Sequence, residues 1–289
     1  MTRNSKKLQR EPSQDYKESE PQSHEPPPQS NQNPFGLSFV VGTDEVPLPS
    51  KGKFYPKDSC FYGVSKVEIR HMTAREEDVL STKAANEGDV NVFDKLLNTL
   101  FVNRTFTAEQ MLDEDKMALL LKARETGYGK EYKTPSYCEK CNTTSEMTFD
   151  LSLASVKEPK SEVEFNVDEG FFELTLPVSK VKVKTKKITP SDKRSLDQEK
   201  EKKKDLNIDF NFTLSYLNKI VISANDVYDR AMLNKFFEVL PAADAKYLLS
   251  YEKDIVPTIS TSQQVECTNC GASLEKEVPL SWAFFRTEF

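Results

Sequence analysis

The chain has 289 residues, of which 37% are hydrophobic and 30% are charged, so it is long enough for one or two modest domains and a polar tail. Its formal net charge of -6 argues against a general nucleic-acid-binding protein. The sequence begins without the apolar segment of a secretory signal, and no run approaches the roughly 18 apolar residues of a membrane span. We therefore expect a soluble, intracellular protein with no membrane partner.

Residues 1–36 are rich in proline, glutamine, serine, asparagine and charge, and their EPPPQSNQNP stretch holds no apolar side chain. Such a composition cannot bury enough apolar surface to offset the entropy cost of ordering the backbone. We predict a disordered N-terminal tail, which serves either as a solvated terminus or as a flexible tether.

The segment after the tail is expected to contain a loop, a strand or hairpin, and helices. VPLPSKGKFYPKDSC, which starts at Val46, has the prolines and glycine of a loop, and VSKVEIRHM has the β-branched residues of a strand. Thr73 and Glu76 have the spacing of a capping box and start a helix in TAREEDVL. Helical apolar spacing follows in NVFDKLLNTLFVN and DEDKMALLLKARETGYG.

The same order of elements recurs further along the chain. FFELTLPVSKVKVKTKKI is rich in strand-forming residues, and TPSDKRSL begins a helix with Thr189 as its cap and Asp192 three residues later. Further helices are predicted in FNFTLSYLNKIVI, DVYDRAMLNKFFEVL and AADAKYLLSYEKD.

A comparison of the two segments indicates an internal duplication. An aspartate, a leucine and two cysteines of the first segment each have an identical residue 129 positions later. The two helix caps match in the same way at an offset of 116 positions. The matches are Asp115 with Asp244, Leu119 with Leu248, Cys138 with Cys267, Cys141 with Cys270, and Thr73 with Thr189. Chance identity is the alternative. We predict an α+β fold of two related strand-plus-helix halves, residues 37–153 and 154–289, related by a pseudo-twofold axis.

Four of the five cysteines form two CxxC pairs, Cys138 with Cys141 and Cys267 with Cys270. Two such turns supply the four thiolates that zinc prefers, and Gly271 suits the left-handed conformation common after a knuckle. Four thiolates leave no open position for a substrate, so we predict one structural zinc ion in a zinc-ribbon-like site shared by the two halves. An iron–sulfur cluster and a dithiol redox pair are weaker interpretations of the same cysteines.

The common catalytic patterns are missing from the sequence. Only two histidines occur, and His71 is the one that lies outside the predicted tail. The sequence has no phosphate-binding glycine loop, dinucleotide motif, zinc-protease motif or nucleophile elbow. We predict a protein that is not an enzyme and has no small-molecule substrate.

The basic run KVKVKTKKITPSDKRSLDQEKEKKKD offers an alternative function, because clustered lysines attract phosphate groups at low salt. Acidic residues interrupt the run, however, and no aromatic residues are interleaved with it. We favour a solvated strand edge followed by an exposed helix. A zinc-ribbon nucleic-acid-binding factor stays as the second hypothesis for the protein.

Two stretches are candidates for binding a partner protein. The C-terminal VPLSWAFFRTEF is too apolar for a free tail, so its aromatic residues either pack in the core or dock into a partner. The prolines of PLPSKGKFYP lower the entropy lost on docking. The candidate docking residues are Pro49, Lys51, Phe54, Tyr55, Trp282, Phe284, Phe285 and Phe289.

Several of these stretches together resemble the baseplate hub assembly proteins of T-even-type, contractile-tailed bacteriophages. They are VPLPSKGKFYP, VEIRHMTAREEDVLS, the two CxxC knuckles and VPLSWAFF, and the resemblance spans residues 46–289. It implies a virus morphogenesis factor that binds hub and other tail proteins, as an assembly catalyst, as a chaperone or as a minor hub component. It also implies a location in the host cytoplasm during assembly or in the tail baseplate of the virion.

Overall fold

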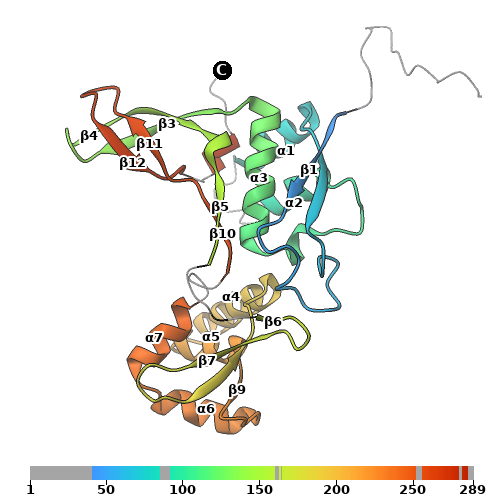
Figure 1. Cartoon of the computed structure of the whole chain (residues 1–289), viewed down its shortest axis with the longest axis vertical. Coiled ribbons are helices and arrows are strands. Elements are labelled where there is room, and N and C mark those ends of the chain that lie inside the picture. The colour runs from blue at the N-terminus through green and yellow to red at the C-terminus, as the bar shows by residue number, and fades with distance from the viewer. Residues whose placement is uncertain are drawn as a thin grey trace, which may run out of the picture. The chain divides into compact units, whose positions relative to one another are not determined.

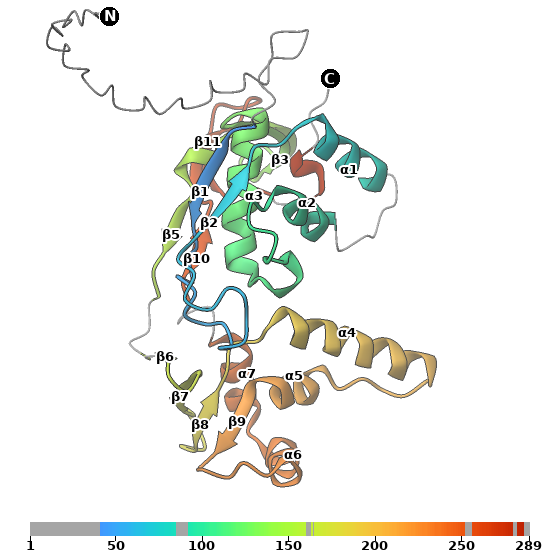
Figure 2. The same cartoon turned by 90° about the vertical axis from the view of Figure 1, so that its right-hand side faces the viewer.

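Helices and short strands alternate along the chain in the computed structural model (Figure 1; Figure 2). The structure describes residues 41–84, 92–159, 163, 165–251, 256–279 and 282–285, and the predicted tail at 1–36 lies outside them. The predicted α+β class is confirmed. Among the described helices, none has the length and apolar character needed to cross a membrane.

The first part of the fold packs a two-stranded sheet against helices. Strand β1 (Thr43–Pro47) pairs antiparallel with β2 (Lys66–Arg70), and the predicted proline-glycine loop connects them. Helix α3 lies beside these strands in both views (Figure 1; Figure 2). The helices are α1 (Ala74–Ala84), α2 (Val92–Leu100) and α3 (Asp113–Tyr128), with a 3-10 turn at Ala108–Gln110. The loop, the strand and the three helices expected here are confirmed.

The second part contains a four-stranded antiparallel sheet with four helices. Its strands are ordered β6 (Phe165–Asn166), β7 (Phe171–Thr175), β8 (Lys182–Thr185) and β9 (Val221–Ala224). The helices are α4 (Pro190–Asp205), α5 (Phe212–Ile220), α6 (Arg230–Val239) and α7 (Ala242–Ser250). The capping box predicted at Thr189 and Asp192 is present at the start of α4.

The prediction of one helix through FNFTLSYLNKIVI is wrong at its end. The helix stops at Ile220, and Val221–Ala224 form strand β9 beside β8. The β-branched residues Val221 and Ile222 favour a strand, and the tertiary partner for that strand decides the outcome.

The basic strand is also placed differently from the expectation. It was expected at a sheet edge, but β8 lies between β7 and β9. Val183 and Thr185 of β8 are buried, while Lys182 is exposed. Successive side chains of a strand point to opposite faces of the sheet, so a central strand can still present a lysine to solvent. The helix that follows is exposed as predicted, because α4 buries only Pro190 and Leu196.

Three further strand pairs lie outside these two sheets. Strand β3 (Glu131–Cys138) forms a hairpin with β4 (Thr143–Asp150), and β11 (Gln263–Glu266) forms one with β12 (Ser273–Lys276). Segments far apart in sequence meet where β5 (Ser155–Lys157) pairs with β10 (Thr258–Ser260), as Figure 1 shows. Short 3-10 turns lie at Leu151–Leu153 and Trp282–Phe285.

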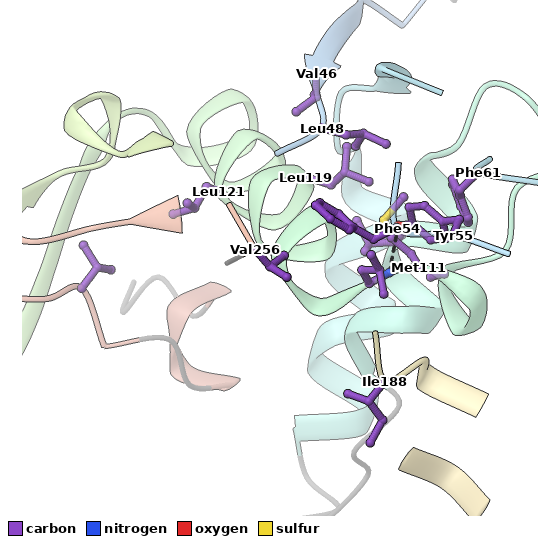
Figure 3. Close-up of a cluster of buried hydrophobic side chains, with 14 of the residues drawn as sticks. Val46, Leu48, Phe54, Tyr55, Phe61, Met111, Leu119, Leu121, Ile188 and Val256 are labelled. Atoms are coloured by element: carbon purple, nitrogen blue, oxygen red, sulfur yellow. Dashed lines mark hydrogen bonds between the residues drawn. The ribbon is translucent and has the colours of Figure 1, made fainter. Parts of the chain in front are cut away.

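One continuous hydrophobic core extends through both parts of the fold. Figure 3 shows side chains of β1, the loop after it and α3 gathered in a single cluster. The loop residue Phe54 reaches the second part, where its ring stacks on Phe172 of β7 with 5.8 Å between centroids. Val41–Phe289 accordingly form one compact unit.

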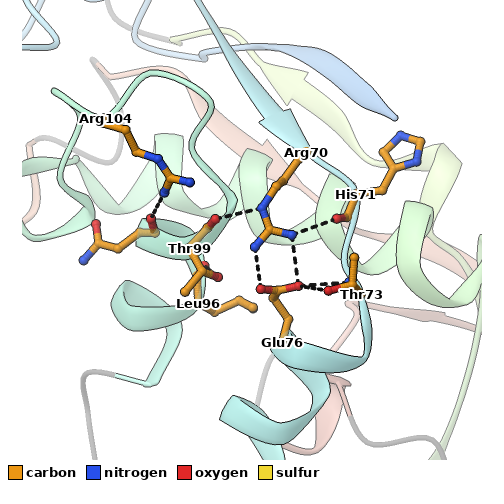
Figure 4. Close-up of polar contacts among 8 residues, drawn as sticks. Arg70, His71, Thr73, Glu76, Leu96, Thr99 and Arg104 are labelled. Carbon is orange, nitrogen blue, oxygen red and sulfur yellow. Dashed lines mark hydrogen bonds and ion pairs between the residues drawn. The ribbon is translucent and has the colours of Figure 1, made fainter. Parts of the chain in front are cut away.

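The start of α1 is fixed by the buried carboxylate of Glu76. This carboxylate accepts hydrogen bonds from the backbone N–H of Thr73 at 3.0 Å and from its hydroxyl at 2.7 Å. It also pairs with both terminal nitrogens of Arg70, at 3.1 and 2.5 Å (Figure 4). Arg70 also donates to the carbonyl of His71 and, from its Nε, to the carbonyl of Thr99 at 3.0 Å, and thereby ties β2 to α2.

Glu76→Gln is expected to remove a pH-dependent part of the stability. Burial alone would raise the pKa of Glu76, but hydrogen bonds from Arg70 and Thr73 and the Arg70 charge lower it to about 2. Because this lies below the unfolded value of about 4.3, the carboxylate stabilises the fold above that pH and stops doing so as the pH falls toward 2. The loss at pH 7 should be on the order of 1–2 kcal/mol, since Arg70 is partly exposed to solvent.

Urea unfolding at pH 7 and pH 3 measures this effect. The difference between Glu76→Gln and the wild type should shrink at pH 3, because the wild-type contribution is then largely lost. Glu68→Gln changes an exposed carboxylate on the neighbouring strand and serves as the matched control. An equal loss for Glu76→Gln at both pH values would contradict the assignment.

Candidate metal centre

The two CxxC sequences occupy the turns of two separate hairpins. Cys138 is the last residue of β3, and Cys267 directly follows β11. Each turn closes through a residue in the left-handed region, Asn142 with φ 54° in the first and Gly271 with φ 68° in the second. This conformation favours glycine or asparagine and folds each CxxC back so that both sulfurs lie on one side.

The four cysteine sulfurs converge on one point. All four Sγ atoms lie within 4.8 Å of one another. The Sγ atoms of Cys138 and Cys270 are 3.8 Å apart, and those of Cys141 and Cys267 are also 3.8 Å apart. A tetrahedral ion with metal–sulfur bonds of about 2.3 Å requires sulfurs about 3.8 Å apart. The site therefore has the donor set and the spacing for a four-coordinate metal ion.

Hydroxyl and amide groups surround the sulfurs. The Thr143 hydroxyl lies 3.0 Å from the sulfur of Cys141, and the Asn269 amide donates to the same sulfur at 3.6 Å. These contacts lower the pKa of Cys141 to about 6, with Thr143 making the larger contribution. The Ser145 hydroxyl lies 3.3 Å from the sulfur of Cys267 and lowers the pKa of that thiol. Both thiols are thus prepared to act as thiolate ligands.

Cys270 carries the thiol whose ionisation the neighbouring cysteines oppose. The backbone N–H of Ala272 lowers the pKa of Cys270, but burial and the three neighbouring thiols together raise it to about 12. Adjacent negative charges oppose further ionisation, and a bound metal ion removes that opposition. Cys270 is also the exposed member of the set, whereas Cys138 and Cys267 are buried.

The fifth cysteine stands apart from this centre. Cys60 is half-buried in the loop between β1 and β2, and its thiol points to the side-chain oxygen of Gln110 at 3.7 Å. The lone His71 likewise has a structural partner, since its ring nitrogen lies 3.0 Å from a carboxylate oxygen of Asp44.

Four of the aromatic candidate docking residues are buried within the chain's own core. Phe54 and Tyr55 are 8% and 4% exposed, and Phe284 and Phe285 are 1% and 2% exposed. Apolar area that is already covered by the chain's own core cannot be buried again on a partner. Pro49 is buried as well, while Lys51 is exposed. Phe289 and the side chain of Trp282 lie outside the described part of the chain.

Tyr55 has a polar task that the sequence did not reveal. Its hydroxyl donates to the buried carboxylate of Asp115 at 2.7 Å and accepts from the backbone N–H of Leu112 at 2.9 Å. Ser50 donates to the same carboxylate from its N–H at 3.0 Å and from its hydroxyl at 2.6 Å. Asp115 therefore fastens the proline-rich loop to the start of α3. An aspartate at matching positions of both segments was the only sequence signal for this role.

The C-terminal aromatic residues adopt the core alternative. The Phe284 ring meets Tyr132 of β3 edge-on at 5.0 Å between centroids, and Phe285 packs against Phe93 of α2 at 5.9 Å. Arg124 of α3 donates its Nε hydrogen to the backbone carbonyl of Phe284 at 2.9 Å. The turn at Trp282–Phe285 thus joins the first helices to the hairpin that carries Cys138.

A protein-family model described as T4 bacteriophage base plate protein matches residues 43–285 of the chain. The match covers both CxxC hairpins, the helices between them and the C-terminal turn. Neither a curated protein nor a solved structure matches the chain.

Proposed function

Because the chain belongs to the family of T4 bacteriophage base plate proteins, we propose that it acts at the hub of the phage tail baseplate, as an assembly factor or as a minor hub component. Family membership itself gives a structural or assembly role and contacts with other phage proteins. The finer proposal is that the protein presents a surface to hub proteins and performs no catalysis. The host cytoplasm during assembly, or the finished baseplate, is its proposed location.

We further propose that the cysteine centre holds one structural zinc ion. The observation that carries this is the convergence of four sulfurs at tetrahedral spacing. Zinc suits a site of four thiolates because it has no geometric preference beyond the tetrahedron and undergoes no redox change. With four protein ligands the ion has no open position, so its proposed contribution is to fasten the two hairpins together.

The predicted duplication is supported by matching contacts at matching positions. Ser50 donates its N–H to Asp115, and Ser179 donates its N–H to Asp244 at 2.8 Å. The next residue in each turn is a lysine in the left-handed region, Lys51 with φ 51° and its counterpart 129 positions later, Lys180, with φ 58°. A left-handed lysine is uncommon, so its recurrence in the same turn supports common descent of the two halves.

The helix caps support the same proposal. In the first half Arg70 pairs with Glu76, whose carboxylate accepts from the Thr73 N–H. In the second half Lys186 pairs with Asp192 at 2.8 Å, and that carboxylate accepts from the Thr189 N–H at 3.1 Å. At the cysteine centre, exchanging the halves turns the pair Cys138 and Cys270 into Cys267 and Cys141, and both separations are 3.8 Å. A pseudo-twofold axis that passes through the middle of the sulfur cluster would give this equality.

The proposed function is tested by making the phage's tail proteins in cells with and without this chain. Baseplate assembly should stop at an incomplete hub when the chain is missing, as seen by sedimentation and electron microscopy. Mass spectrometry of purified tails then separates a minor hub component, which is retained, from an assembly factor, which is released. Complete baseplates formed in the absence of the chain would refute the proposal.

The second candidate, a zinc-ribbon nucleic-acid-binding factor, draws on the exposed lysines in the last turn of α4, among them Lys202 and Lys204. If it is right, the protein should bind DNA with an affinity that falls steeply as salt rises. The net charge of -6 and the acidic residues within the same helix favour the baseplate role.

A further inference from the structure

The two proposed halves differ in how the start of their last helix is covered. In the first half, the residues just before and at the start of α3 are buried, with Met111 fully buried and Leu112 2% exposed. Their cover is the loop between β1 and β2. Tyr55 in this loop bonds Asp115 and Leu112, and Cys60 reaches Gln110.

The second half lacks this loop. From Lys51 to the start of β2 at Lys66 the chain runs 15 positions, whereas from Lys180 to the start of β8 at Lys182 it runs 2. The difference of 13 equals the change in repeat offset from 129 to 116. Residues in this stretch of the first half therefore have no counterpart in the second.

The equivalent surface of the second half is consequently open. Val178 in the neighbouring turn is 55% exposed, whereas its counterpart Pro49 is buried. Val239 at the end of α6 adds an apolar side chain that is 79% exposed. Leu240 and Pro241, the counterparts of Met111 and Leu112, are only half-buried. We name the group formed by Val178, Val239, Leu240, Pro241 and Ala242 the α7 cap surface.

The buried carboxylate beside the α7 cap surface already has its hydrogen-bond partners. Asp244 accepts hydrogen bonds from the N–H groups of Val178 and Ser179, at 2.8 Å each. Pro241 is the counterpart of Leu112, whose backbone N–H donates to the hydroxyl of Tyr55 in the first half. Proline has no N–H, so this hydrogen bond has no equivalent in the second half. What the surface still offers is apolar area, so it suits apolar and aromatic side chains without a required hydroxyl.

We propose that the α7 cap surface binds an aromatic-bearing loop of another baseplate protein, which takes the place that residues 53–62 occupy on α3. The chain's own loop shows which chemistry covers this kind of helix start. A second copy of the chain cannot supply it with this same loop, because Phe54, Tyr55 and Phe61 are buried in their own core. The inference rests on the proposed function and on the proposed duplication.

The test uses the full chain, produced together with the phage's tail proteins, and measures the amount of baseplate complex recovered with it. Val239→Asp and Val178→Asp should each lower recovery at least tenfold, because each puts a charge into an apolar contact. Leu206→Asp is the matched control, since Leu206 is an equally exposed apolar residue (68%) at the end of α4. Its recovery should stay within twofold of the wild type.

A photo-crosslinking amino acid at position 239 identifies the occupant. The expected product joins this position to a segment of a baseplate protein that contains a phenylalanine, tyrosine or tryptophan. Unchanged recovery with both aspartate variants, or a cross-link to a second copy or to a segment without aromatic residues, would overturn the inference while leaving the proposed function intact. A wild-type chain that forms no complex with tail proteins would instead refute the proposed function.

Discussion

Replacing Cys267 by serine is expected to abolish metal binding and to unfold the centre of the protein. The sulfur of Cys267 is buried and lies 3.8 Å from that of Cys141, so a shorter and poorly ionised hydroxyl cannot replace it as a ligand. Structural zinc contributes on the order of 10 kcal/mol of apparent binding free energy, which is comparable to the whole stability of a typical domain. The two hairpins should then separate.

Elemental analysis and circular dichroism measure this outcome. The wild type should carry one zinc ion per chain, and Cys267→Ser should carry none and show a lower, broader thermal transition. Cys60→Ser is the matched control, because Cys60 lies in a separate loop and should leave metal content and melting temperature unchanged. A wild-type protein that is pure, folded and free of metal would refute the zinc proposal.

The cysteine cluster could be predicted from the sequence because its information is local. Each CxxC turn contains its own ligands and its own left-handed residue, and the matching distance between the pairs indicated that the turns meet. The helix starts at Thr73 and Thr189 were predictable for the same reason, since a cap and its acidic partner are three residues apart. In each case the deciding contact lies within one turn of the chain.

The mistaken expectations concern contacts that are distant in sequence. The sequence of Val221–Ala224 does not indicate that β8 lies beside it, so the predicted helix α5 was extended too far. Tyr55 looks like a docking residue in a proline-rich loop until Asp115, 60 residues away, is brought to its hydroxyl. A hydrophobic residue on a loop can cover its own core or a partner's, and composition does not separate these outcomes.

Truncation after Ser281 is expected to unfold the protein rather than merely weaken partner binding. It removes Phe284 and Phe285, which are buried against Tyr132 and Phe93. Losing a buried phenylalanine side chain typically costs about 3–5 kcal/mol, so losing both approaches the whole stability of a typical domain. The truncation also takes away the carbonyl that accepts from Arg124, and so leaves a buried donor unpaired.

Phe284→Ala separates the core role from a docking role more gently, because it keeps the backbone carbonyl that Arg124 uses. Its free energy of unfolding, measured with urea, should fall by about 3–5 kcal/mol with one metal ion still bound. Leu153→Ala is the control, since Leu153 is 59% exposed and should change stability by less than about 0.5 kcal/mol. If Phe284→Ala were as stable as the wild type but failed to support baseplate assembly, the aromatic turn would be an interface after all. If Phe284→Ala instead lowers stability and leaves binding unchanged, the turn has a structural role. It would then hold strand β3 in place, because Phe284 packs against Tyr132, which lies on the same strand as Cys138.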